Sequence, residues 1–149
     1  MQPLHEKEKG LDELISLIPD DSDIVIPLTN GEPNQILKAI DQHPERFSAL
    51  RLHQLLEVRD RNYIKGAFPH IRYNSYFLGA YARTAFNNHQ CELIPNNFRS
   101  MPELLEKTAK NPIVVTQAAP MDDEGYFSLG TTADYTAYFI GKISFILQV

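Results

Sequence analysis

The stretch from Ile24 to Asp41, IVIPLTNGEPNQILKAID, decides the fold. Its first three residues are apolar and β-branched, which is typical of a short strand buried inside a sheet. A turn that contains glycine and proline follows at Thr29 to Pro33. Residues 34–41 then have the apolar spacing of a helix, with three positions facing inward: Ile36, Leu37 and Ile40. A buried strand that leads through a tight turn into an amphipathic helix predicts an α/β protein.

The same alternation of strand and helix continues along the chain. Further strands are expected at residues 49–56, 72–78, 91–94, 113–116 and 143–149. Helices are expected at residues 10–18, at 79–87 with Phe86 buried, after a capping box from Ser100 to Glu103, and from Thr131 or Thr132 to Ile140. Strands joined by helical crossovers imply a mostly parallel sheet with helices on both faces. The predicted fold is a three-layer αβα sandwich with a mostly parallel sheet, in one domain over residues 1–149.

The last expected strand, Ile143 to Val149, is apolar and lies in a weakly charged tail. An exposed strand of this kind is an aggregation hazard. If the chain stands alone, we therefore expect this strand to lie within the sheet with other strands on both sides. Because the strand runs off the end of the sequence, we also expect the chain to be one part of a larger enzyme.

Composition excludes several classes of protein. The chain has 149 residues and a net charge of −5, which argues against broad binding to the phosphate backbone of nucleic acids. Its one cysteine, Cys91, allows no intramolecular disulfide and no cysteine-rich zinc site, and we expect it to be buried and inert. The N-terminus, Met1 to Lys7, lacks the apolar core of a signal peptide, and no segment has the roughly 20 apolar residues of a membrane helix. These features favour a cytoplasmic protein with no membrane partner.

Two turns are candidate binding sites. The first contains Asn30, Gly31 and Glu32, where free N–H groups at the start of a helix could hold a carboxylate or phosphate, although a well-made βα turn explains the same residues. The second begins at Pro120 and Met121 and continues through an acidic turn from Asp122 to Gly125. The spacing of its acids does not fit a calcium loop, so a solvated turn is favoured over a metal site.

Other polar residues give weaker signals. The basic residues Arg51, Arg59, Arg61 and Lys65 are typical of a solvated face, and binding the phosphates of an acidic ligand is the alternative. The aromatic residues Tyr73, Tyr76, Phe77 and Tyr81 are more typical of a core than of a stacking platform. No histidine pairs with a serine or with Cys91 in a nucleophile pattern. The residues by themselves therefore assign no catalytic residue.

Several segments together resemble the N-terminal domain of the acetyl-CoA hydrolase/transferase family, which includes 4-hydroxybutyrate, butyrate and succinate CoA-transferases. The most specific is Ala119 to Gly130, APMDDEGYFSLG, followed by Asp134-Tyr135-Thr136, although the family usually has serine where Ala119 stands. Supporting segments are Asp23 to Ile26 with Gly31-Glu32-Pro33, Ser75 to Gly79 with Arg83, Ile94-Pro95, and Met101 to Leu104. Residues 57–70 match loosely.

The resemblance implies the fold of the CoA-transferase superfamily and a protein about three times as long. It implies that a glutamate in a second domain, absent from this chain, forms a glutamyl-CoA thioester, so that the chain has no catalytic residue and no tightly bound cofactor. Acyl-CoA and small carboxylates are the expected partners, together with a C-terminal half or a homo-oligomer. The expected pocket residues are Asn30, Gly31, Glu32, Pro120 and Met121. The alternatives are a non-catalytic domain that binds a ligand or subunit, and a sugar-phosphate enzyme of related fold.

Overall fold

The computed structural model describes residues 8–149, and Met1 to Lys7 lie outside the described residues. The α-helices are α1 (Leu11–Ser16), α2 (Asn34–Gln42), α3 (Ala80–Asn87) and α4 (Met101–Thr108). The strands are β1 (Asp23–Ile26), β2 (Leu50–Gln54), β3 (Ile71–Ser75), β4 (Glu92–Leu93), β5 (Pro112–Gln117) and β6 (Ser144–Gln148). Short 3₁₀ helices are η2 (Thr29–Gly31), η3 (Pro44–Arg46), η4 (Phe98–Ser100) and η5 (Tyr135–Phe139). The segment from Leu55 to His70, between β2 and β3, contains no regular element.

The strands of the described residues form one sheet in the order β4-β3-β2-β1-β5-β6, with every neighbouring pair parallel. The chain first builds the sheet outward from β1 to β4 and then returns to the other side of β1 for β5. The strand order therefore reverses between β1 and β5. In open sheets of this kind, ligands bind beyond the carboxyl ends of the strands at such a switch point.

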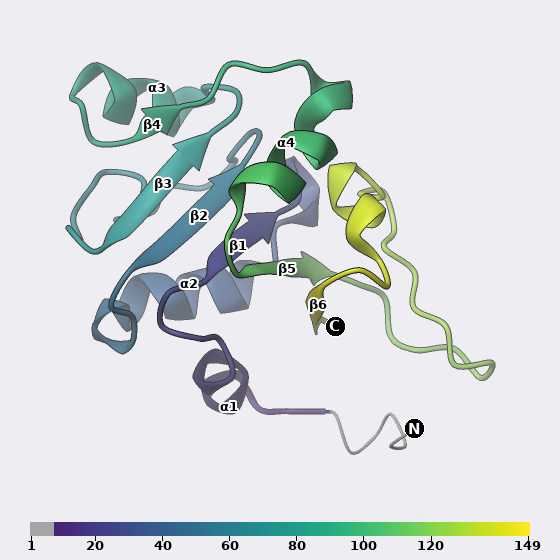
Figure 1. Ribbon diagram of the computed structural model, residues 1–149. Coiled ribbons are helices and arrows are strands. Elements are labelled where there is room, and N and C mark those ends of the chain that lie inside the picture. Colours follow the sequence, from purple (N-terminus) through teal and green to yellow (C-terminus); the bar gives the residue numbers. More distant parts are fainter. Residues whose placement is uncertain (1–7) are drawn as a thin grey trace.

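Two apolar clusters cover the two faces of the sheet. The larger one packs α1, α2 and α3 against alternate residues of the strands, among them Ile24 in β1 and Leu52 in β2. The smaller one packs α4 and η5 against the opposite face, where it includes Val25 in β1 and Val114 in β5. Figure 1 shows α4 on one side of the sheet and α1 and α2 on the other. The predicted αβα sandwich is confirmed, and its sheet is wholly parallel.

Three local predictions were wrong. The helix expected from Thr131 or Thr132 is the 3₁₀ helix η5, because the Asp134 side chain accepts the Thr136 amide at 2.8 Å and starts the turn there. Ser100 ends η4 with helical backbone angles (φ −89°, ψ −8°) and makes no capping hydrogen bond, and Glu103 binds Lys107 at 2.6 Å instead of reaching back. Phe86 is 38% exposed, because the buried stripe of α3 contains only Ala82 and Ala85.

The expectation for the last strand was correct only in part. Strand β6 joins the sheet, but within the described residues it lies at the edge and pairs with β5 alone. The connection through η5 brings the chain back beside β5 on the outer side, so that no other strand of residues 8–149 covers the far edge of β6. Among residues 8–149, no helix has both the length and the apolar character needed to cross a membrane.

Candidate functional site

The loops that follow β1 and β5 meet at the switch point of the sheet. Gly31, at the end of η2, is buried against Thr132, and a Cβ atom at position 31 would lie 2.4 Å from the Thr132 Cγ2 atom. Only glycine permits this approach, because any side chain would overlap a buried threonine. The glycine that the sequence places in a βα turn thus brings the loop after β1 into contact with the segment before η5.

Asp134 and Tyr135 join the same two segments by hydrogen bonds. The Leu28 amide donates to Oδ2 of Asp134 at 2.8 Å, and the Tyr135 hydroxyl donates to the carbonyl oxygen of Ile26. The Leu55 amide donates to the Tyr135 hydroxyl at 3.2 Å, so the tyrosine also reaches the end of β2. Burial raises the pKa of the Asp134 carboxyl, against its hydrogen bonds with Thr136 and Leu28. These side chains hold the switch-point loops in one arrangement.

The backbone at the carboxyl end of β1 is strained. Thr29 has a φ angle of 46°, in the left-handed region that β-branched residues rarely enter. Its amide donates to the carbonyl oxygen of Leu56 at 3.0 Å, which ties the strained residue to the loop after β2. Such strain is retained only where surrounding contacts fix it, and it is common at binding sites.

Glu32 is buried and its carboxylate is fully engaged. Oε1 accepts from Nε2 of Gln54 and from the amide of Val58, each at 2.9 Å. Oε2 accepts from Nη1 of Arg59, also at 2.9 Å. The carboxylate therefore ties η2 to the loop after β2.

The N-terminus of α2 is also occupied. Oε1 of Gln148, at the end of β6, accepts the amide of Gln35 at 2.8 Å and that of Ile36 at 3.3 Å. These are the N–H groups at the start of the helix that an anion would otherwise use. A side chain from the far end of the chain thus caps the helix of the predicted turn.

A second buried carboxylate closes the N-terminus of α3. Oε1 of Glu57 accepts the amides of Tyr81 and Ala82 at 3.0 and 2.9 Å, and Oε2 is buried with no hydrogen-bond partner in the described part of the chain. The carboxylate packs so closely on Gly79 that a Cβ there would lie 2.4 Å from Oε1. Glu57 therefore stabilises the start of α3, since a negative charge at a helix N-terminus is favourable.

A polar chain crosses the α4 side of the sheet below the switch point. Oδ1 of Asp23 lies 2.7 Å from Nε2 of His53, and Nδ1 of His53 lies 3.0 Å from the hydroxyl of Tyr76. The three residues are buried. Burial acts to raise the pKa of Asp23, but hydrogen bonds from His53, Arg51 and the Lys110 amide outweigh it and lower the pKa to about 2. Asp23 is thus ionised at neutral pH.

The predicted pocket residues lie on two separate loops. Asn30 is exposed beside the buried Gly31 and Glu32 at the switch point. Pro120 and Met121 are exposed on the loop after β5, which projects from the body of the molecule in Figure 1. That loop folds back on itself, because the Ala119 amide donates to Ser128 O and the Asp122 amide to Tyr126 O. The structure places both loops at the carboxyl edge of the sheet, and their role in binding stays a prediction.

Most of the basic stretch takes part in internal contacts. The guanidinium groups of Arg59 and Arg61 bind Glu32 and Asn34, and the Lys65 amine binds Asp60 at 2.6 Å. Arg51 binds Asp23. Of the four aromatic residues, Tyr73 and Tyr76 are buried, whereas Phe77 and Tyr81 are 57% and 39% exposed. Cys91 is buried, and burial raises the pKa of its thiol to about 11.

Sequence reasoning missed several residues that shape this site. Residues more than 100 positions away contact β1, the loop after it and the start of α2: Tyr135, Thr132 and Gln148. No local pattern reveals such contacts. Glu57 lies in the segment that matched no expected element. The one available signal was the run Asp134-Tyr135-Thr136, which carried the family resemblance but suggested no contact with Leu28 or Ile26.

The family model for the acetyl-CoA hydrolase/transferase N-terminal domain matches residues 2–146. The chain therefore belongs to this family. It is 28% identical over 133 residues to the 4-hydroxybutyrate coenzyme A transferase of Clostridium kluyveri, covering 88% of this chain and 31% of that protein. It is 24% identical over 130 residues to the succinyl-CoA:cyclohexane-1-carboxylate CoA transferase of Geobacter metallireducens, covering 87% of this chain and 30% of that protein.

Solved structures show the same fold. RipA from Yersinia pestis superposes with a TM-score of 0.84 at 25% identity, over 97% of this chain and 37% of that one. The 4-hydroxybutyrate CoA-transferase from Porphyromonas gingivalis gives a TM-score of 0.65 at 18% identity, over 97% of this chain and 33% of that one. The chain thus spans about a third of the length of the relatives that it matches.

Proposed function

We propose that this chain is the N-terminal portion of a CoA-transferase or acetyl-CoA hydrolase that moves CoA between an acyl-CoA and a small carboxylate. The observation that carries the proposal is the family match over residues 2–146. Both curated relatives named above are CoA transferases, and this chain corresponds to about 30% of each. Coenzyme A enters as a thioester substrate, and the proposal requires no tightly bound cofactor.

In this proposal the nucleophile that forms the glutamyl-CoA thioester belongs to the missing part of the protein. Nucleophilic catalysis by a carboxylate requires an oxygen that can reach the thioester carbonyl. Three acids of this chain are held by internal contacts. Glu32 binds Gln54, Val58 and Arg59, and Asp134 binds Leu28 and Thr136. Glu57 is buried, with one oxygen on the amides at the start of α3. Their engagement supports a nucleophile supplied from elsewhere.

The role of this portion is to shape the acyl or carboxylate pocket with the loops after β1 and β5. Asn30 presents an exposed amide side chain beside Gly31, and the buried Glu32 fixes the loop from below. Pro120 and Met121 contribute an apolar wall, with Met121 43% exposed. Uncovered apolar residues at the same edge, such as Phe77 and Phe98, fit contact with the rest of the enzyme or with a second subunit.

A reconstitution assay tests the proposal. The 149-residue chain is incubated with acetyl-CoA and a small carboxylate, alone and with a C-terminal half from the family, and turnover and covalent CoA adducts are measured. We expect neither from the chain alone and both from the mixture, with the adduct on a glutamate of the C-terminal half. Full activity of the isolated chain, or an adduct mapped to one of its own glutamates, would contradict the assignment.

A matched pair of variants tests the pocket. Asn30→Ala should raise the KM for the carboxylate in the reconstituted enzyme by about tenfold, since a hydrogen bond to a charged group contributes about 1.5 kcal/mol or more. Asn87→Ala, at the exposed end of α3, is the control and should leave the KM unchanged. Equal KM values for the two variants would remove Asn30 from the pocket.

The second candidate is a non-catalytic domain that binds a ligand or another subunit. The engagement of Glu32, Glu57 and Asp134 favours it as well, because this candidate requires no nucleophile. Calorimetry with CoA, acetyl-CoA and small carboxylates separates the two ideas. Binding without turnover in any reconstituted mixture would support the second candidate.

A further inference from the structure

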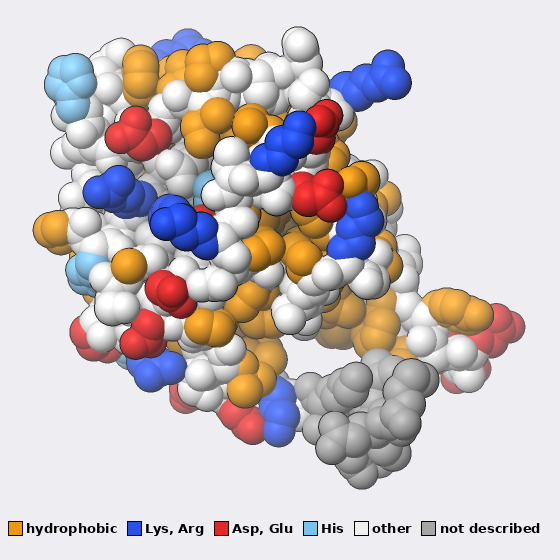
Figure 2. Space-filling view, viewed as in Figure 1, with side chains coloured by type: hydrophobic (Ala, Val, Ile, Leu, Met, Phe, Trp, Pro, Cys, Tyr) orange, Lys and Arg blue, Asp and Glu red, His pale blue; other side chains and the backbone are white. Residues whose placement is uncertain are grey.

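A groove lies at the amino-terminal ends of β2 and β3, at the edge of the sheet opposite the loops described above. Its volume is about 480 Å³, and its lining includes three cationic side chains, Arg51, Arg72 and Lys110. Small-molecule sites commonly have volumes of about 300–1,000 Å³. Figure 2 shows Lys and Arg side chains on the surface over β2 and β3, on the side that carries α4.

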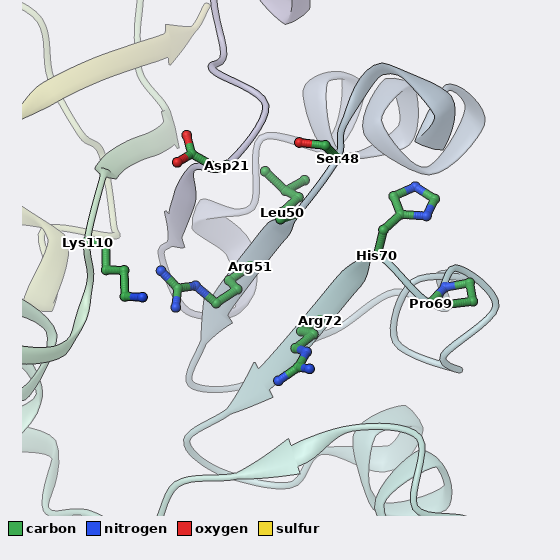
Figure 3. Close-up of a pocket in the computed structure, with 9 residues that line it drawn as sticks. Asp21, Ser48, Leu50, Arg51, Pro69, His70, Arg72 and Lys110 are labelled. Atoms are coloured by element: carbon green, nitrogen blue, oxygen red, sulfur yellow. The ribbon is translucent and has the colours of Figure 1, made fainter.

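The pairing of the strands brings the first two cations together. Arg51 of β2 and Arg72 of β3 are partners in the parallel register, so both side chains leave the same face of the sheet on adjacent strands. Like charges in such a position repel each other and are destabilising. Lys110, just before β5, approaches from the other side, and Figure 3 shows its amine directed toward Arg51. Three segments far apart in sequence thus direct positive charge at one groove.

The internal acids neutralise only one of these three cations. Asp23 is fully buried behind the groove and binds Arg51, and it also accepts from His53 and from the amide of Lys110. Asp21 also lines the groove, but its Oδ2 accepts from the side chain of Asn111 at 3.1 Å, and its carboxylate points away from Arg51 and Arg72 in Figure 3. Among residues 8–149, no ion pair includes the side chain of Arg72 or Lys110.

This part of the sheet also lacks apolar cover. On the α4 side, the apolar cluster lies over β1 and β5 and includes Val25, Val114 and Leu105. At the start of β2 and β3, the residues on this face are Arg51 and Arg72, and Arg72 is exposed. The pair Asp23–Arg51 gives the groove one guanidinium that is fixed before any ligand arrives, with a side-chain exposure of 29%. A fixed guanidinium beside two cations without acidic partners is suited to an anion with more than one oxygen.

We propose that this groove binds the phosphate group of a small phosphorylated molecule. Two guanidinium groups can each bind phosphate oxygens in a bidentate manner, and the lysine adds a third charge. Because Asp23 compensates Arg51, the charges of Arg72 and Lys110 remain, and they match a phosphate dianion better than a monocarboxylate. The proposal goes beyond the transferase function and does not depend on it, because the groove lies at the other edge of the sheet. The phosphate can come from free inorganic phosphate or from a nucleotide, and the test separates these sources.

The test is a titration of the ¹⁵N-labelled 149-residue chain with inorganic phosphate, ADP and coenzyme A, followed by NMR. We expect backbone shifts at residues 48–52, 70–72 and 110–111 with each probe. Binding should weaken by about tenfold in Arg72→Gln and in Lys110→Gln, the loss expected for one charge-assisted contact. Dissociation constants at least tenfold lower for ADP or coenzyme A than for phosphate would identify a nucleotide as the occupant. Similar dissociation constants for all three probes would show that the phosphate group alone accounts for binding.

Two control variants show whether a loss of binding is specific to the groove. Lys38→Gln on α2 and Arg83→Gln on α3 remove the same charges at exposed positions of helices on the opposite face, and they should bind phosphate as the unchanged chain does. The spectrum of each variant without ligand shows whether it is folded. The proposal is overturned if the shifts fall at residues 29–31 instead of the groove, if no probe shifts the groove, or if Arg72→Gln and Lys110→Gln bind as tightly as the controls. Binding of an acidic protein surface in place of all three probes would also overturn it.

Discussion

Asp23 and His53 form a buried contact across two neighbouring strands, with 2.7 Å between Oδ1 of Asp23 and Nε2 of His53. Asp23 begins β1, and His53 is the diagonal neighbour two residues beyond its register partner, Arg51. The other carboxylate oxygen of Asp23 receives Arg51 and the amide of Lys110. One buried carboxylate therefore links β1, β2 and the segment just before β5.

Replacing Asp23 should cost much of the stability of the fold. Asp23→Asn keeps the shape but removes the charge that Arg51 and His53 face, and we expect a loss of about 2 to 4 kcal/mol in the free energy of unfolding. Denaturant titration measures it. Asp20→Asn, at an exposed position nearby, should change stability by less than about 0.5 kcal/mol. Equal losses in the two variants would show that the buried network contributes nothing.

The low pKa of Asp23 predicts a specific acid sensitivity. The folded pKa is about 2 and the ordinary value is 3.8, so the stabilisation is complete above about pH 4 and is lost as the pH falls toward 2. A shift of this size corresponds to about 2 kcal/mol. Thermal unfolding between pH 5 and 2 should show the loss, and the loss should be smaller in Asp23→Asn. An identical pH dependence in the variant would contradict the assignment to Asp23.

The contact between Gly31 and Thr132 predicts a steric penalty. Gly31→Ala would place its Cβ 2.4 Å from Cγ2 of Thr132, so we expect a loss of about 1 to 3 kcal/mol as the two loops move apart. Gly10→Ala is the control, because no atom of residues 8–149 lies within 4 Å of a Cβ there and its φ of −64° suits alanine. Unfolding experiments compare the two. A neutral Gly31→Ala would mean that the loops after β1 and β5 are not in contact.

The cap that Gln148 provides to α2 can be tested in the same way. Gln148→Ala removes the acceptor for the amides of Gln35 and Ile36, and the loss of such a cap costs about 1 kcal/mol. Hydrogen exchange should accelerate at these two amides. Gln42→Ala, at the exposed end of α2, should leave their exchange unchanged. Unchanged exchange in Gln148→Ala would show that β6 does not dock on this helix.

The regular elements of the sheet were predicted well because their signals are local. The apolar run Ile24 to Ile26 and the run Ile113 to Val115 are strands in the structure, and the spacing of Ile36, Leu37 and Ile40 gave α2. The failures came where a side chain binds another partner than the one that the local pattern predicts. Glu103 turned to Lys107 on its own helix, and Asp134 began η5 while also binding Leu28, 106 positions away.

For the predicted binding site, too, the local structure was predicted correctly and the long-range contacts were not. Sequence indicated a turn at Asn30 to Glu32 that could hold an anion, and the structure confirms the turn and its position at the carboxyl edge. It also shows that Gln148 occupies the helix amides and that Arg59 occupies the Glu32 carboxylate. The sequence does not reveal whether a backbone amide is already hydrogen-bonded to a distant side chain, so only the folded chain shows which amides a ligand could use.

By itself, the sequence determined the fold class, the order of strands and helices along the chain, and the resemblance to the acetyl-CoA hydrolase/transferase family. These follow from patterns a few residues long and from one specific motif, Ala119 to Gly130. Only the tertiary structure decided which side chains meet: Gly31 with Thr132, Asp23 with His53, and Arg51 beside Arg72. The reason is physical, because strand order and register set distances between residues that the chain itself keeps far apart.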